Sequence, residues 1–165
     1  FLVRNLRLPS PAARLTVLAK ERGFFVESDR MNGTTKLLDI TGLEVEFLIG
    51  KMGAGKEPAL KMNIGVTAQA LWHMDIILKN TVEVRCFNHI VTVPTPEAYV
   101  IHKMIINGER GKKAEKDARA VNNLLPLLNE EKLTKMFGSL SKKEKARVRT
   151  FAEAHGVAER ILGSI

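Results

Sequence analysis

The most regular pattern in the chain is the spacing of apolar residues in its C-terminal half, where they recur every three or four positions. This spacing is typical of helices that bury one face, and it predicts helices over residues 96–107 and 114–128. Thr95 and Pro96 start the first helix, because threonine caps helix N-termini and proline suits the first helical position. The residues expected to face the core of these helices are Ala98, Ile101, Met104, Ile105, Val121, Leu124, Leu125 and Leu128.

Two further helices are expected after Pro126, which kinks or ends the preceding helix. Asn129 caps the first of them, and Ser141 caps the second, where Glu144 completes a capping box. A last short helix is expected after Gly156. The residues of this region with core spacing are Leu133, Met136, Phe137, Val148, Phe151 and Ala152.

The N-terminal half instead alternates apolar and polar residues over short stretches, which is the pattern of strands with one buried face. The strongest turn signal is Asn32-Gly33, a pair that favours a hairpin. Residues 66–70 are interpreted as a short turn or helix. One helix is expected to begin at Pro11, with Leu15, Leu18 and Ala19 facing inward. The expected strands cover residues 24–26, 35–40, 43–49, 82–86 and 90–93, with further turns at 41–42 and 88–89.

This order of elements indicates an α+β fold, with a mixed sheet, flanking helices and a C-terminal helical bundle. We place the boundary at Pro94, so that residues 1–93 form the α+β domain and residues 94–165 the helical region. The 165 residues, 45% of them apolar, suffice for one core. Because the chain begins at Phe1 in what reads as the second half of a strand, we expect the N-terminal domain to be truncated.

Composition narrows the class of protein. The single cysteine, Cys86, excludes an internal disulfide framework and a thiolate zinc cluster, and its place in an alternating stretch predicts a small core residue. No apolar run approaches the length of a membrane span and no signal sequence is apparent, so we expect no membrane partner and a cytoplasmic location.

The formal net charge of +8 favours anionic partners, and part of it gathers at one corner between two predicted helices. Lys103 is placed at the margin of the core on the first helix, and Lys116 and Asp117 lie in the first turns of the second. Arg110 and Lys113 lie in the loop between them, together with Lys112. Two interpretations remain open, a solvated basic loop or a site for polyphosphate or nucleic acid.

Glu44 and Glu46 form the most interesting acidic pair. They alternate with apolar residues in the expected strand over residues 43–49, so both carboxylates project from one face. Such a pair suits a divalent cation or a general base, but without further context it is more typical of a solvent-facing strand with one buried side. Asp39 is a less well placed candidate acid.

Residues 50–57 imitate a phosphate-binding loop. The glycine, four-residue, glycine, lysine spacing is present after a strand, but Glu57 stands where a serine or threonine would bind magnesium. A carboxylate there repels phosphate, so we interpret the stretch as a glycine-rich loop.

The order and spacing of several motifs resemble nucleotidyltransferase-fold proteins of the minimal, DNA-polymerase-beta-like superfamily. The likeness extends to about Leu128, and abortive-infection-type nucleotidyltransferase toxins show a similar series of lysine, arginine and aspartate. The residues that carry it are Val93-Pro94-Thr95-Pro96-Glu97, His102-Lys103, Arg110 and Lys116-Asp117.

The resemblance implies a nucleotide-binding transferase that moves a nucleotidyl group from a nucleoside triphosphate to a hydroxyl on RNA, protein or a small molecule. It implies that Glu46 is a catalytic, metal-binding acid for Mg²⁺ or Mn²⁺, and that Lys103 and Asp117 belong to the catalytic machinery. Phosphate binding is expected from Lys103, Arg110, Lys113 and Lys116. The family's glycine-serine turn and paired aspartates precede such a segment and are missing here, so we expect the fragment to be inactive alone.

Two other function classes stay open. One is a nucleic-acid-binding module that uses the basic corner and the basic helix containing Lys142 and Arg149. The other is a noncatalytic interaction protein with a partner protein, such as one half of a toxin–antitoxin or phage-defence pair.

Overall fold

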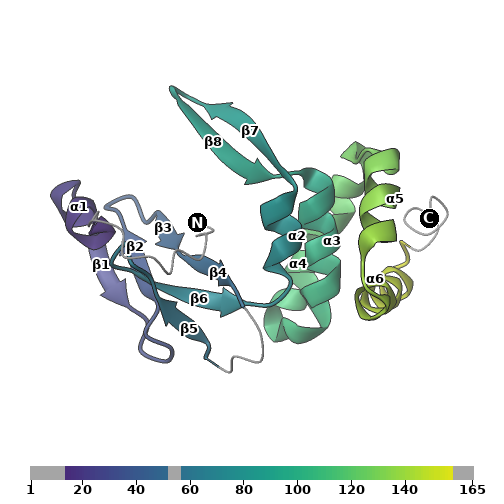
Figure 1. Cartoon of the computed structure of the whole chain (residues 1–165), viewed down its shortest axis with the longest axis horizontal. Coiled ribbons are helices and arrows are strands. Elements are labelled where there is room, and N and C mark those ends of the chain that lie inside the picture. Colours follow the sequence, from purple (N-terminus) through teal and green to yellow (C-terminus); the bar gives the residue numbers. More distant parts are fainter. Residues whose placement is uncertain (1–13, 52–56, 158–165) are drawn as a thin grey trace. The chain divides into compact units, whose positions relative to one another are not determined.

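The computed structural model describes residues 14–51 and 57–157 (Figure 1). Contacts between Cα atoms divide the chain into two compact units, Phe1–Met74 and Asp75–Ile165, which are described separately below. This division groups the last hairpin with the helices, whereas the sequence pattern placed a domain boundary after residue 93. In the described ranges, no helix is long and apolar enough to cross a membrane.

The first unit opens with α1 (Leu15–Glu21) and an antiparallel sheet in the order β1-β2-β3. The hairpin turn at Asn32-Gly33 is confirmed: Asp29 Oδ1 accepts hydrogen bonds from the backbone nitrogens of Met31 and Asn32, and Gly33 has a φ of 70°. Only glycine adopts such a φ without steric cost. The strands are β1 (Phe25–Ser28), β2 (Thr35–Leu38) and β3 (Glu44–Glu46).

A second sheet in the same unit is mixed. Its strands are β4 (Leu48–Gly50), β5 (Ala59–Lys61) and β6 (Thr67–Leu71), in the order β4-β6-β5. β6 pairs parallel with β4 and antiparallel with β5, so the expected turn or helix over residues 66–70 is wrong. The single strand expected over residues 43–49 is also wrong, because the chain leaves the first sheet at Phe47 and enters the second at Leu48.

The core of this unit lies between these elements and uses mostly small and branched side chains. Leu15 packs against it as expected and Ala19 is buried, but Leu18 is 47% exposed, so its assignment to the inner face is wrong. The buried members of the core are Ala19, Leu37, Phe47, Ile49, Met62, Val66, Ala68 and Ala70.

The second unit contains the helices and one hairpin. The short helix α2 (Met74–Lys79) starts at the division between the units and leads into β7 (Thr81–Cys86) and β8 (His89–Pro94). These strands pair antiparallel around a two-residue loop, and the ribbon projects from the helices of the unit (Figure 1). Cys86 is exposed, so the expectation of a core cysteine is wrong: among the described residues, none covers this end of the hairpin enough to bury it.

Four helices complete the second unit, with α3 at their centre in contact with each of the other three. They are α3 (Pro96–Ile106), α4 (Ala114–Leu124), α5 (Glu130–Ser139) and α6 (Lys142–Ala154). The predicted caps are confirmed, since Thr95 accepts from Ala98 N, Asn129 from Lys132 N, and Ser141 forms a capping box with Glu144. The buried core is Val100, Ile101, Met104, Ile105, Ala118, Val121, Leu133, Phe137, Val148, Phe151, Ala152 and Val157.

The α+β class, the mixed sheet and the C-terminal helical bundle are therefore confirmed. α3 is fully enclosed on its apolar side because Val100, Ile101, Met104 and Ile105 are each at most 2% exposed. A rigid central helix of this kind fixes the position of the polar residues at its margin.

Candidate functional site

The carboxylate of Asp117 joins two cations of the second unit. Nζ of Lys103 lies 2.8 Å from Oδ1 of Asp117, and Nε of Arg110 lies 2.8 Å from Oδ2. The Asp117 side chain is 4% exposed, against 15% for Lys103 and 28% for Arg110. We call these three side chains the Asp117 cluster; it brings together three of the residues that the sequence predicted for one site.

The turn between α3 and α4 is what closes this cluster. It consists of two short 3-10 helices, Asn107–Glu109 and Gly111–Lys113, with Gly111 at a φ of 51° that favours glycine. Nδ2 of Asn107 donates to the carbonyl oxygen of Ala114 at 2.8 Å and ties the end of α3 to the start of α4. Arg110 lies between the two 3-10 helices and points back to Asp117 on α4.

Electrostatics keep the Asp117 cluster charged. Burial alone raises the pKa of Asp117, but hydrogen bonds and charge attraction from Lys103 and Arg110 outweigh it, and its pKa lies below the ordinary value. The carboxylate is therefore ionised at neutral pH and acts as a fixed acceptor for both cations. Two cations and one carboxylate leave one net positive charge at the cluster.

Tyr99 lies one helical turn before Lys103 and shares its environment. Nζ of Lys103 is 5.4 Å from the centroid of the Tyr99 ring, within the range of a cation–π contact. Burial, followed by the negative charge of Asp117, raises the pKa of the Tyr99 hydroxyl. The phenol is therefore neutral at physiological pH and able to donate a hydrogen bond.

The remaining lysines of the corner face solvent. Lys112, Lys113 and Lys116 are exposed, and the described residues give none of them an ion-pair partner. They differ in this from Lys103 and Arg110, whose cationic groups are held in place by the carboxylate. The corner thus combines two oriented cations with three exposed ones.

A hollow of about 470 Å³ lies beside the Asp117 cluster, between the start of α3 and the later turns of α4. Tyr99 belongs to its wall and also contacts Lys103, so the hollow and the cluster are adjacent. It is a wide, open depression rather than an enclosed cavity. Its lining residues are Pro94, Pro96, Tyr99, Ala120, Asn123 and Leu124.

Glu46 lies on β3 in the first unit, whereas the Asp117 cluster belongs to the second unit. Lys36 is its direct cross-strand neighbour on β2, with Nζ 3.2 Å from Glu46 Oε1, and it also pairs with Glu44. The hydrogen bonds that Lys36 donates to Glu44 and then to Glu46 raise the pKa of Lys36. The two carboxylates do share one face, as their alternation predicted.

The described residues do not form a metal site by themselves. Between residues 14 and 51 and between 57 and 157, no group of three or more histidine, cysteine, aspartate or glutamate side chains gathers at one point. The carboxylates of Glu44 and Glu46 already have a counter-charge, because both pair with the ammonium group of Lys36. Asp39 is occupied as well, because its Oδ1 accepts hydrogen bonds from the backbone nitrogens of Thr41 and Leu43.

The sequence did not indicate Lys36 and Tyr99 as site residues. The hairpin register of β2 and β3 could have shown that Lys36 faces Glu46, and helical spacing places Tyr99 four residues before Lys103. Most of the glycine-rich loop, residues 52–56, lies outside the described part of the chain.

Comparisons with known proteins bear on the family and the fold of the chain. A family model described as Nucleotidyltransferase matches residues 11–144, whereas a comparison with curated proteins finds no match. The fold is similar to the crystal structure of an antigenic nucleotidyltransferase-like protein from Paracoccidioides brasiliensis, with a TM-score of 0.53 and 12% identity. The match covers 90% of this chain but 66%, less than two thirds, of that chain, and at this identity it shows the fold alone. Since the family model spans well over half of the 165 residues, the chain belongs to the nucleotidyltransferase family.

Proposed function

We propose that this chain binds a nucleoside triphosphate at the corner between α3 and α4 and takes part in transfer of a nucleotidyl group to a hydroxyl. The observation that carries the proposal is the Asp117 cluster, in which one buried carboxylate holds two cations in fixed directions. Fixed cations stabilise phosphate charge without the cost of reorganising at the moment of reaction. A merely solvated basic loop needs no buried carboxylate.

Each residue of the corner has a separate role in this proposal. Lys103 and Arg110 contact phosphate oxygens, and the guanidinium of Arg110 keeps nitrogens besides Nε for such contacts. Asp117 is a positioning residue, because it acts on the nucleotide through these two cations. Lys113 and Lys116 are exposed and add positive potential that attracts the triphosphate to the corner.

The hollow beside the cluster is the proposed place for the nucleoside. Tyr99 presents an aromatic ring in its wall, and Asn123 offers an amide that both donates and accepts hydrogen bonds. A base stacked against Tyr99 leaves the phosphates near Lys103, because Lys103 Nζ lies 5.4 Å from that ring. This arrangement predicts that Tyr99→Phe keeps nucleotide affinity and that Tyr99→Ala lowers it.

Binding of Mg²⁺ or Mn²⁺ would need further carboxylates besides those of the described residues. Glu46 would contribute one ligand to such a site, after Lys36 releases it. The metal would neutralise phosphate charge and polarise the transferring phosphoryl group. Glu46→Gln is therefore expected to lower transfer while leaving triphosphate binding at the corner intact.

Calorimetric titration of the purified chain with each nucleoside triphosphate tests the corner directly. We expect saturable binding that Lys103→Met or Arg110→Gln weakens about tenfold or more, because each change removes charged hydrogen bonds. Lys135→Met is the matched control, since Lys135 is an exposed lysine on α5. Equal affinities in all variants would contradict the proposal.

A transfer assay with labelled nucleoside triphosphate then distinguishes the acceptor classes. RNA, a partner protein and a small molecule bearing a hydroxyl are offered in turn, with Glu46→Gln as the control for chemistry. RNA binding that weakens as the salt concentration rises, but does not change when nucleotide and metal are added, would favour a nucleic-acid-binding module. A stable protein complex without nucleotide binding would favour a noncatalytic interaction protein.

A further inference from the structure

The β7–β8 hairpin has one apolar face and one polar face. Its register places Val82 opposite Val93 and Val84 opposite Val91, and opposing residues share a face of the sheet. The other face carries Glu83 opposite Thr92 and Arg85 opposite Ile90, so both charged residues of β7 lie on it. Val82 is 42% exposed and Val84 38%, so the described residues leave the valine face partly open.

The outer edge of β7 is also open in the described part of the chain, because β7 pairs there only with β8. Cys86 and His89 flank the two-residue loop. In a hairpin with such a loop the flanking pair exchanges backbone hydrogen bonds, and bonded pairs alternate with non-bonded pairs from there along the ladder. The backbone groups of Glu83 and Arg85 therefore face away from β8. They offer N–H donors and C=O acceptors to a further strand.

We propose that β7 pairs antiparallel with β7 of a second copy of this chain, so that two hairpins form one four-stranded sheet. The second copy is the occupant because the edge of β7 is complementary to itself. A two-fold axis at Val84 places Glu83 opposite Arg85 of the partner subunit, and Arg85 opposite Glu83 of the partner subunit. Both pairs are opposite charges facing each other across the new ladder.

The pleat and the charges together select this register. A shift by one residue would place Glu83 on the same face as valines of the partner subunit, which the two-residue periodicity forbids. A shift by two residues in either direction would bring Glu83 against its own copy or Arg85 against its own copy. Like charges directly opposite each other destabilise a sheet, so the Val84-centred register is favoured.

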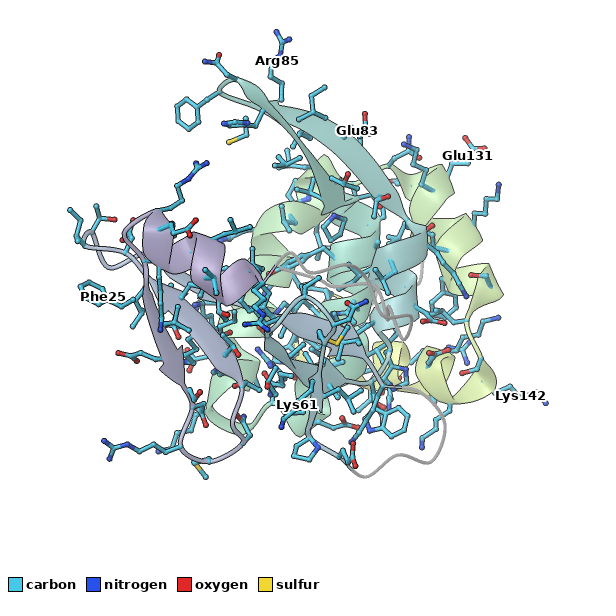
Figure 2. All side chains as sticks on the ribbon, turned by 60° about the vertical axis from the view of Figure 1, so that its left-hand side comes forward. Phe25, Lys61, Glu83, Arg85, Glu131 and Lys142 are labelled. Carbon is cyan, nitrogen blue, oxygen red and sulfur yellow. The ribbon has the colours of Figure 1, made fainter. Side chains whose placement is uncertain are left out.

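β7 is better suited to this pairing than β8. Exposed edge strands are usually protected by charged side chains, above all lysine, by proline or by a covering segment. β7 (TVEVRC) contains neither lysine nor proline, and its two charged residues, Glu83 and Arg85, have opposite signs. β8 ends in Pro94, which has no N–H to donate. Glu83 and Arg85 project from the same side of the hairpin, where Figure 2 shows both side chains free of the helices. A lone two-stranded hairpin is marginally stable in water, so two added strands also stabilise it.

Charge reversal tests the register. Sedimentation equilibrium of the full chain is expected to show the mass of two chains for the wild type. Glu83→Arg or Arg85→Glu alone places like charges opposite each other and should raise the dissociation constant at least about tenfold. The double variant Glu83→Arg/Arg85→Glu exchanges the charges and should restore the dimer. A wild type that remains monomeric at every concentration, or a double variant no better than the singles, overturns the proposal.

Disulfide trapping tests the two-fold axis. In the proposed register the Val84 residues of the two copies face each other as a pair without backbone hydrogen bonds, about 4.5 Å apart at Cα, which suits a disulfide. Val84→Cys/Cys86→Ala should therefore form a covalent dimer under mild oxidation. Val91→Cys/Cys86→Ala is the matched control, on the same face but on β8, and should remain largely monomeric. Equal cross-linking of the two variants overturns the proposal.

Discussion

The ammonium Nζ of Lys103 on α3 lies 2.8 Å from Oδ1 of Asp117 on α4, although the residues are 14 positions apart. The same carboxylate holds Arg110, so the corner between the helices depends on one acidic side chain. Asp117 itself is 3% exposed and lies beside the buried Ala118. The geometry of the cations therefore depends on the helical core, and substitutions at Asp117 affect both stability and ligand binding.

Asp117→Asn is expected to lower the free energy of unfolding by about 2–4 kcal/mol, because it leaves two partly buried cations without their counter-charge. Urea unfolding followed by circular dichroism measures the loss. Glu115→Gln is the control: its side chain is 83% exposed and pairs only loosely with Arg119, so the change should stay within about 0.5 kcal/mol. Equal losses in both variants would show that the buried pair contributes nothing.

Stability should fall on acidification, and Asp117 should account for part of that fall. Its folded-state pKa lies below the ordinary value near 4, so the unfolded chain binds the proton more readily. The contribution is complete above the unfolded pKa and is lost as the pH falls through the folded pKa. Urea unfolding at pH values from neutral down to about 3 should therefore show a steeper loss for the wild type than for Asp117→Asn. Parallel curves would rule out a depressed pKa at Asp117.

Glu97 connects α3 to the start of α5, because its Oε1 accepts a hydrogen bond from the backbone nitrogen of Asn129 at 3.0 Å. Burial raises the pKa of Glu97, but this hydrogen bond and others outweigh it and hold the pKa below the usual value. Glu97→Ala should cost about 1–3 kcal/mol of unfolding free energy, and Glu97→Gln less, since the amide oxygen still accepts. Thermal or urea unfolding of both variants measures the difference; identical losses would exclude this connection.

The capping box at the start of α6 makes a separate prediction. Ser141 Oγ accepts from the backbone nitrogen of Glu144, and Glu144 Oε2 accepts from the Ser141 backbone nitrogen at 3.0 Å. Ser141→Ala should therefore lower stability by about 1 kcal/mol. Thr150→Ala, at an exposed position of the same helix, should change it far less. A neutral Ser141→Ala would mean that the cap is dispensable.

Local signals predicted most of the helical unit from the sequence. Thr95, Asn129 and Ser141 each cap a helix through contacts within three residues, and such contacts are visible in sequence order. β6 was missed because its buried residues Ala68 and Ala70 are small and common in helices, and its partners are distant in sequence. Its strand identity comes from pairing with β4 and β5, which no local pattern contains.

In the candidate site, too, local features were predictable from the sequence and contacts between distant residues were not. Lys103, Arg110 and Asp117 were named as candidates from charge, spacing and family resemblance. The contact of Asp117 with both cations at once was not predicted, because it depends on the 3-10 turns between the helices. Cys86 was placed in a core because alternation marks an apolar face without showing whether another layer covers it. Lys36 was missed because its contact with Glu46 depends on strand register.

Phe47 separates two sheets by a single residue, with Glu46 paired in the first sheet and Leu48 in the second. Its side chain is 4% exposed, and its carbonyl oxygen accepts a hydrogen bond from the backbone nitrogen of Gln69 on β6 at 2.8 Å. The backbone next to Glu46 is thus tied to β6, the central strand of the second sheet. A substitution at Phe47 that repacks this core would shift the backbone of Glu46 and redirect its carboxylate without altering any residue of the acidic face.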